Sequence, residues 1–287
     1  MHTKRHLVLT ALFAAIFWGG SFPIVKFGLH YLKPLWFADL RMSIAFLFMF
    51  IFVKNKKAFW KFPKEIWWLG LFNAAGYFLQ FVGMEYTTAA KASFFVNINV
   101  VFVVILAHFL FQEKLQWEKY LAVFLSLLGI YFLVSKGQGI QIFKEGSALG
   151  DALVLLAGIS WAFFIIINKK VLAYPAFSVF DIVTAFVFTT VLFMTPVAVI
   201  FEPFPVHASA TGIGILLTTG IVFTLIPFYF WSVSLKGLTA TLTSFLTLSE
   251  ILFAVAFSFI FLGETLQPIE IGGGVLLLIA IFAASVR

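Results

Sequence analysis

Residues 89–111 read AAKASFFVNINVVFVVILAHFLF, a run of 23 residues in which Lys91 is the one formally charged side chain. A helix that crosses the hydrocarbon core of a bilayer needs about 20 consecutive, mostly apolar residues. Runs of this kind occupy most of the chain. The sequence predicts ten membrane-spanning helices, at residues 7–28, 34–53, 66–85, 89–111, 118–135, 149–168, 178–200, 210–233, 238–262 and 267–286.

The composition agrees with a membrane protein, because 62% of the 287 residues are hydrophobic and 11% are charged. An average soluble domain has roughly 45–50% and 25%, and it could not hide so much apolar surface from water. A soluble enzyme, a disordered chain and a nucleic-acid-binding protein are therefore excluded. There is no Cys, and the five His residues form no metal-binding motif. We therefore expect no catalytic residue, no metal and no cofactor.

The distribution of positive charge predicts the orientation. The first run follows Lys4 and Arg5 like a signal peptide, but it continues to Leu29 and is too long for one, so we expect a retained helix. With the N-terminus inside, 13 of the 19 Lys and Arg residues fall on the cytoplasmic side. These residues are Lys4, Arg5, Lys54, Lys56, Lys57, Lys61, Lys64, Lys114, Lys119, Lys169, Lys170, Lys236 and Arg287. We predict a multi-pass protein of the cell (cytoplasmic) membrane with both termini in the cytoplasm.

The chain also repeats itself. A shift of 151 residues aligns Glu113-Lys-Leu-Gln116 with Glu264-Thr-Leu-Gln267, and a shift of 143 aligns Trp18 with Trp161. Because five helices are an odd number, the second copy enters the membrane from the opposite side. The predicted fold class is an all-α integral membrane protein with two inverted five-helix repeats. The first repeat spans residues 1–135, an inter-repeat loop spans 136–148, and the second repeat spans 149–287.

Three segments resemble EamA-type carriers of the drug/metabolite transporter superfamily. They are GYFLQFVGMEYTTAAKASFF at 76–95, FWGGSFP at 17–23 and GDALVLLAGISWA at 150–162. The resemblance implies a carrier for amino acids, amines or other small metabolites, usually outward and often coupled to protons. It also implies a central cavity built from helices 1–4 and 6–9, with helices 5 and 10 at the periphery. Many members have a proline where Val100 and Ile251 stand here, so the residue that would kink these helices is missing.

A stripe of polar residues lies on one face of the ninth helix, where Thr239, Thr243, Thr247 and Glu250 follow at helical spacing. An acid inside a membrane is costly, which makes Glu250 a candidate for binding a substrate amine or the coupled proton. Alternatively, Glu250 bonds to a neighbouring helix and the threonines bond to their own i−4 carbonyls. Asn99 is the repeat partner of Glu250.

The third helix presents Asn73, Tyr77 and Gln80 on one face. Their repeat partners are Thr224, Phe228 and Trp231. This half-polar, half-aromatic set is typical of a cavity lining, although packing between helices explains it equally well.

Five further residues complete the predicted site. Trp18 and Trp161 occupy matching mid-span positions and form either an aromatic wall or bulky packing, with Asn168 two turns beyond Trp161. Arg41 would bind a substrate carboxylate, or it is a snorkelling or ion-paired side chain at a helix end. Asn97 lies on a second face of the fourth helix.

The predicted substrate-binding residues are Trp18, Arg41, Tyr77, Gln80, Asn97, Asn99, Trp161, Asn168, Trp231, Thr243, Thr247 and Glu250, with Glu250 as the proton-coupling candidate. The predicted function is secondary active transport of a small polar metabolite, an amino acid or an amine, by alternating access and in the direction of export. A lipid-linked sugar flippase or a nucleotide-sugar-type exchanger is the alternative. The expected partners are a small-molecule substrate, the lipid bilayer and a proton, without nucleic acid. The oligomeric state is a monomer or homodimer, with the Gly272-Gly-Gly274 run as one option for the dimer face.

Overall fold

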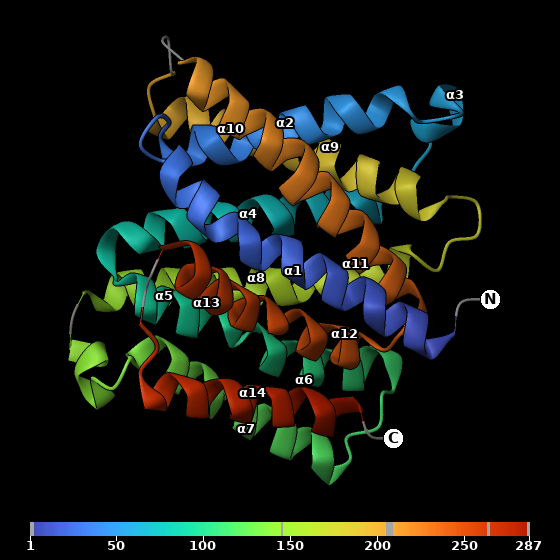
Figure 1. Ribbon diagram of the computed structural model, residues 1–287. Coiled ribbons are helices and arrows are strands. Elements are labelled where there is room, and N and C mark those ends of the chain that lie inside the picture. The colour runs from blue at the N-terminus through green and yellow to red at the C-terminus, as the bar shows by residue number, and fades with distance from the viewer. Residues whose placement is uncertain (1–2, 145, 205–208, 263–264, 286–287) are drawn as a thin grey trace.

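The computed structural model describes residues 3–144, 146–204, 209–262 and 265–285, and these residues are helical throughout, apart from short connections. Ten long helical segments lie side by side (Figure 1). The first five are α1 (Lys4–Gly28), α2 (Pro34–Ile51), α4 (Glu65–Tyr86), the pair α5 (Ala89–Asn97) and α6 (Asn99–Phe111), and α7 (Trp117–Ser135). The second five are α8 (Ala148–Val171), α9 (Val179–Phe201), the series α10 (Ala210–Gly220), η2 (Ile221–Leu225) and α11 (Ile226–Gly237), the pair α12 (Ala240–Thr247) and α13 (Ser249–Leu262), and α14 (Pro268–Ser285). The short helices α3 (Lys56–Phe59) and η1 (Gly139–Lys144) lie in connections.

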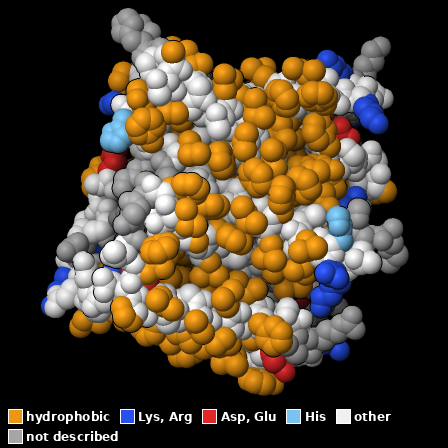
Figure 2. All heavy atoms as spheres, viewed as in Figure 1, with side chains coloured by type: hydrophobic (Ala, Val, Ile, Leu, Met, Phe, Trp, Pro, Cys, Tyr) orange, Lys and Arg blue, Asp and Glu red, His pale blue; other side chains and the backbone are white. Residues whose placement is uncertain are grey.

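The surface of the bundle is that of a membrane protein. Apolar side chains cover the middle of the face seen in Figure 2, and Lys and Arg side chains gather toward its left and right edges. Phe109, Ile200 and Phe282 expose more than 70% of their surface, which hydrocarbon tolerates and water does not. Eight of the described helices are long and apolar enough to cross a membrane. The prediction of an all-α, multi-pass membrane protein is confirmed.

Both ends of the described chain lie at the same end of the bundle (Figure 1), where Lys4 Nζ donates to the Ser285 carbonyl at 3.4 Å. We call this the terminal end, and we call the opposite end, which holds the connection between α4 and α5, the distal end. Helix α1 begins at the terminal end, whereas α8 begins at the distal end (Figure 1). The first helices of the two halves therefore run in opposite directions.

Contacts between the helices follow the same pattern in both halves. Helix α1 packs against α11 and α13, and its counterpart α8 packs against α4 and against α5 and α6. Helix α4 packs against α9, as α10 and η2 pack against α2. Two pairs are their own counterparts, namely α2 with α9 and α7 with α14, and the fourth and ninth membrane helices meet through α6 and α12. The main contacts of α1, α2 and α4 thus have equivalents at α8, α9 and the α10–α11 series.

Helices α7 and α14 touch through two glycines. A Cβ atom added to Gly129 would lie 2.8 Å from the Gly273 carbonyl oxygen, and one added to Gly273 would lie 2.7 Å from the Gly129 carbonyl oxygen. Gly273 therefore serves packing within the chain rather than a dimer face. Its neighbour Gly272 faces open space, because no atom would lie within 4 Å of an added Cβ.

The fourth and ninth membrane helices are both interrupted, although Val100 and Ile251 replace proline. At the first interruption, Val101 N donates to the Ile98 carbonyl at 2.9 Å, and at the second, Ile251 N donates to the Leu248 carbonyl at 3.1 Å. Both are i−3 bonds of a tightened turn. Polar side chains support the change, because Asn97 Nδ2 donates to the Ser93 carbonyl at 2.7 Å and Ser249 Oγ donates to the Leu246 carbonyl at 2.6 Å. The interruptions therefore do not need a proline.

The glycine contact predicts a difference between two adjacent residues. Gly273→Leu should lower the thermal-unfolding midpoint of the detergent-purified protein, because the new side chain would meet the α7 backbone at a cost of about 1–3 kcal/mol. Gly272→Leu is the matched control and should leave the midpoint within about a degree of the wild-type value, since its side chain enters open space. Equal midpoints for the two variants would contradict the packing of α14 on α7.

Candidate functional site

Arg41 lies near the middle of α2 and is 6% exposed. Its Nε donates to Thr224 Oγ1 at 3.1 Å, and its Cζ lies 5.9 Å from the centre of the Tyr77 ring. Within the described residues, Arg41 has no carboxylate within ion-pair distance. A charged side chain at this depth is therefore compensated only by a hydroxyl and an aromatic face, which is costly inside a membrane.

Two aromatic pairs repeat across the halves of the molecule. Tyr77 meets Trp161 edge to face, with ring centres 5.0 Å apart, and Phe228 meets Trp18 in the same way at 5.5 Å. Tyr77 and Phe228 are repeat partners, as are Trp161 and Trp18. Trp161 also packs closely on Gly76, where an added Cβ would lie 2.8 Å from the indole ring. Each tryptophan thus pairs with the lining set of the other half.

Phe164 of α8 joins these pairs into one aromatic layer. Its ring centre lies 6.0 Å from that of Trp161, and it stacks on Trp231 at 5.8 Å with an angle of 8° between the rings. Trp231 in turn lies 6.0 Å from Trp18. Sequence reasoning missed Phe164, because nothing distinguishes it among the 40 Phe residues of the chain.

Thr243 and Thr247 of the ninth helix are occupied by local hydrogen bonds. Thr243 Oγ1 donates to the Thr239 carbonyl and Thr247 Oγ1 donates to the Thr243 carbonyl, both at 2.9 Å. Thr247 Oγ1 also accepts a hydrogen bond from Trp231 Nε1 at 3.0 Å. Thr243 is therefore used within its own helix, while Thr247 holds the indole of Trp231 in place.

Glu250 begins the helical segment after the second interruption and is half-buried. Its carboxylate has no hydrogen-bond or ion-pair partner in the described part of the chain. Its backbone lies against α1, where an added Cβ on Gly19 would lie 2.6 Å from the Glu250 carbonyl oxygen. Both Arg41 and Glu250 interact electrostatically with the Tyr77 hydroxyl. Two groups of opposite charge thus act on Tyr77, and neither has a counter-ion within the described residues.

The four amides of the predicted site lie in different surroundings. Asn97 is buried and donates to its own helix, and Asn99 opens α6 directly after the first interruption. Asn168 is fully buried near the terminal end, and neither atom of its amide has a partner in the structure described. Gln80 is half-buried on α4. None of the four forms a hydrogen bond with Arg41, Tyr77 or Trp231 within the described residues.

We call Trp18, Arg41, Tyr77, Trp161, Thr224, Phe228, Trp231, Thr247 and Glu250 the central group.

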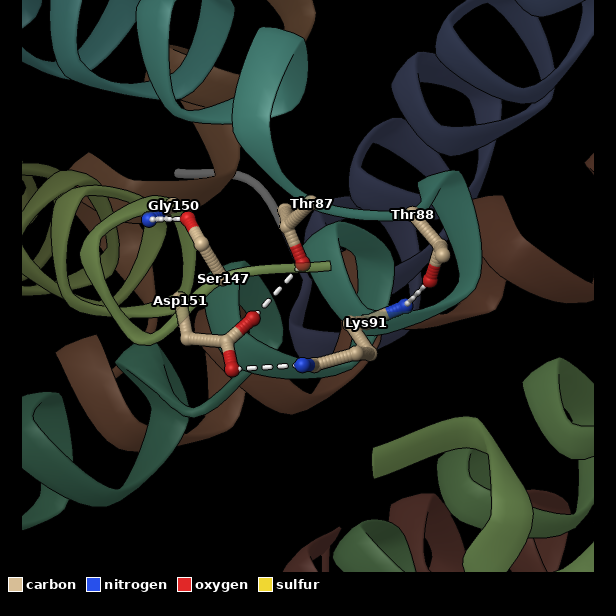
Figure 3. A network of polar contacts seen from close by, with 6 residues as sticks. All are labelled: Thr87, Thr88, Lys91, Ser147, Gly150 and Asp151. Carbon is tan, nitrogen blue, oxygen red and sulfur yellow. Dashed lines mark hydrogen bonds and ion pairs between the residues drawn. The ribbon is translucent and has the colours of Figure 1, made fainter. Parts of the chain in front are cut away.

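A buried ion pair closes the distal end (Figure 3). Lys91 is 2% exposed, and its Nζ lies 2.6 Å from a carboxylate oxygen of Asp151. Thr87 Oγ1 donates to the other carboxylate oxygen at 2.6 Å. The segment before α8 reaches this corner by a turn at Gly146, whose φ of +73° favours glycine, and Ser147 N donates to the Tyr86 carbonyl at 2.8 Å. The corner between α4 and α5 is thus tied to the start of α8.

The equivalent corner between α11 and α12 is held at the terminal end by different bonds. Lys169 Nζ donates to the carbonyls of Leu235 and Leu238 at 2.8 and 2.6 Å, respectively. Glu113 accepts a hydrogen bond from Ala240 N at 2.8 Å, at the start of α12. A cation on free carbonyls and an anion at a helix N-terminus both stabilise helix ends.

Similarity to known proteins identifies this chain as a transporter and also identifies its family. The model of the EamA-like transporter family matches residues 6–135 and 148–286. The chain belongs to this family. It is 27% identical to an "Uncharacterized transporter" of Archaeoglobus fulgidus, over 100% of this chain and 99% of that protein. It is 26% identical to a "Probable amino-acid metabolite efflux pump" of Salmonella typhimurium, over 95% of this chain and 92% of that protein.

One solved crystal structure superposes on this chain with a TM-score of 0.82 and 15% sequence identity, and the match covers 97% of each chain. At this identity the likeness shows the fold alone. The expected family is confirmed, and so is the expectation that the protein is a transporter and not an enzyme.

The ion pair at the distal end predicts a measurable coupling. In a double-mutant cycle of Lys91→Ala and Asp151→Ala, the two changes should be non-additive by about 1–3 kcal/mol, because the partners are in contact, with Lys91 buried and Asp151 partly buried. The cycle can be measured from thermal unfolding in detergent. Lys170 and Glu65 form the control pair, at 3.8 Å with Lys170 62% exposed, and should show coupling below about 0.5 kcal/mol. Additive effects at Lys91 and Asp151 would rule out the ion pair.

Proposed function

We propose that this transporter exports a small polar metabolite, an amino acid or an amine-like compound, across the cytoplasmic membrane by secondary active transport. One observation carries the proposal: Arg41 and Glu250 bring opposite charges to the middle of the bundle, and neither has a counter-ion in the described residues. Uncompensated charges in a membrane are expensive and are retained where they act on a ligand or a proton. A substrate with both an anionic and a cationic group would neutralise them together.

The aromatic layer beside these charges supports the same class of substrate. Trp18, Trp161 and Trp231 offer apolar and π surfaces that suit the carbon skeleton of a metabolite, or its ammonium group. Pockets for small molecules are mostly apolar with a few placed polar groups. Export agrees with the name of the Salmonella relative, "Probable amino-acid metabolite efflux pump". Glu250 is the proposed carrier of the coupled proton.

Alternating access would follow from two inverted repeats. The opposite directions of α1 and α8 (Figure 1) and the matched contacts of the two halves support this architecture, with repeats at 1–135 and 149–287 joined by the loop 136–148. One bundle would rock against the other around the fixed central group. The Lys-rich terminal end would face the cytoplasm.

A lipid-linked substrate is the second candidate, because one cavity of the bundle suits hydrocarbon. This cavity has a volume of about 240 Å³ and a lining of apolar side chains. The lining residues are Leu35, Leu71, Ala74, Ala75, Phe78, Phe193, Met194 and Val197. No charged residue is among them, so a headgroup would have to bind elsewhere.

The inverted architecture can be tested with single cysteines, because the natural chain has none. Gln116 and Gln267 are exposed repeat partners in short connections. In intact cells, Gln267→Cys should react with a membrane-impermeant maleimide, whereas Gln116→Cys should react only after the membrane is opened. Labelling of both residues from the same side would overturn the inverted architecture.

The site can be tested by transport into proteoliposomes and by ligand-induced thermal shift across a metabolite panel. Glu250→Gln should abolish uptake driven by a pH gradient, because an amide carries no proton. Arg41→Ala should weaken binding roughly ten- to a hundredfold, as expected for loss of a charged hydrogen bond. Glu85→Gln, an exposed acid at the end of α4, is the control and should behave like the wild type. If neither variant changes binding or uptake, the proposed site is wrong.

A further inference from the structure

The eighth membrane helix widens at its centre. Residues Ile221–Leu225 form a π-helical turn, in which Ile226 N donates to the Ile221 carbonyl, five residues back. Pro227 explains the position, because its ring excludes the carbonyl four residues earlier and it has no N–H to donate. Single π-helical turns are rare and frequently lie at functional sites. The widened turn points to a role beyond packing.

Thr224 of the widened turn is fixed in one orientation. Its Oγ1 donates to the Thr219 carbonyl at 2.9 Å, again five residues back. Because a hydroxyl has one proton, Oγ1 can meet Arg41 Nε only as an acceptor, and it does so at 3.1 Å. Thr224 is fully buried, so water does not compete for this contact. The π-helical turn therefore determines where the Arg41 side chain is held.

The same turn also supports the backbone of α2. A Cβ atom added to Gly220 would lie 2.8 Å from the Arg41 carbonyl oxygen. Arg41 is thus held at both its main chain and its Nε atom by residues of one segment, while the Tyr77 ring lies beside the guanidinium.

The two terminal nitrogens of Arg41 are left without a hydrogen-bond partner in the described residues. Guanidinium is planar, and two of its nitrogens match the two oxygens of a carboxylate. Because Nε is bound to Thr224, the two terminal nitrogens of Arg41 are the atoms that can bind a carboxylate. The opposite charge of Glu250 also acts on Tyr77, which disfavours a doubly charged phosphate and favours an anion that also carries a cation.

We propose that Thr224 is a positioning residue that aims the terminal nitrogens of Arg41 at a carboxylate of the substrate. The site then selects metabolites that retain a carboxylate over the matched amines that lack it. This inference rests on the proposed export of amino-acid or amine-like metabolites and narrows that substrate class.

The test compares amino acids with the amines formed by their decarboxylation, one pair at a time, by ligand-induced thermal shift of the detergent-purified full chain. The wild type should bind the amino acid of a recognised pair at least about tenfold more tightly than the amine. Thr224→Val keeps the shape and removes the hydroxyl, and it should reduce this preference roughly ten- to a hundredfold with little change for the amine. Thr224→Ser should restore the preference. Thr218→Val is the matched control, since Thr218 is exposed on the same helix and bonds only to Gly214.

Other outcomes would contradict the positioning role of Thr224, the preference for a carboxylate, or the proposed function. Equal weakening of both members of a pair in Thr224→Val would show a structural role and overturn the proposal. A wild type that prefers the amine would also overturn it, while leaving export of amines intact. If neither member of any amino-acid and amine pair binds, the proposed function fails. A comparison of benzoate with benzamide then tests the carboxylate site by itself. Stabilisation by benzoate that Thr224→Val loses would support the site, and no stabilisation of the wild type by benzoate would refute it.

Discussion

Within a bilayer, a backbone N–H or C=O group that leaves the helical pattern finds no water to replace its partner. Three irregular features of the described helices obey that constraint. The interruptions after Asn97 and Thr247 are closed by i−3 bonds, and side chains of Asn97 and Ser249 bind nearby carbonyls. In the widened turn, Thr224 binds the carbonyl of Thr219. Short polar side chains therefore allow three membrane helices to depart from regular geometry at mid-depth.

The same departures surround the groups with unusual chemistry. Glu250 follows the second interruption, Asn99 follows the first, and Arg41 donates a hydrogen bond to Thr224 of the widened turn. An irregular turn brings polar groups and backbone into positions that a straight helix does not offer. The central group is thus built where the helices are least regular, while the regular segments, rich in Phe, supply rigid walls around it.

The sequence predicted the helices well and the site only partly. The spans 34–53 and 118–135 correspond to α2 (Pro34–Ile51) and α7 (Trp117–Ser135), because hydrophobic length is a property of the local sequence. Contacts between residues distant in the sequence are not a property of the local sequence. Lys91 and Asp151 lie on different helices and form a buried pair that no spacing rule indicates. The bond from Arg41 to Thr224 depends on a π-helical turn, and Pro227 does not by itself specify that geometry. For Thr243 and Thr247, two arrangements were consistent with the sequence, and the hydrogen bonds within the helix are observed.

The crossing of Gly129 and Gly273 has a mechanical consequence. Here the first and second halves of the chain meet backbone to backbone, and no long side chain stands between them to change its rotamer. Sliding one helix along the other would drive carbonyl oxygens into Cα atoms, whereas a small rotation about the contact point would not. The two helices therefore join the halves of the chain at this rim by a contact that resists sliding along the helix axes.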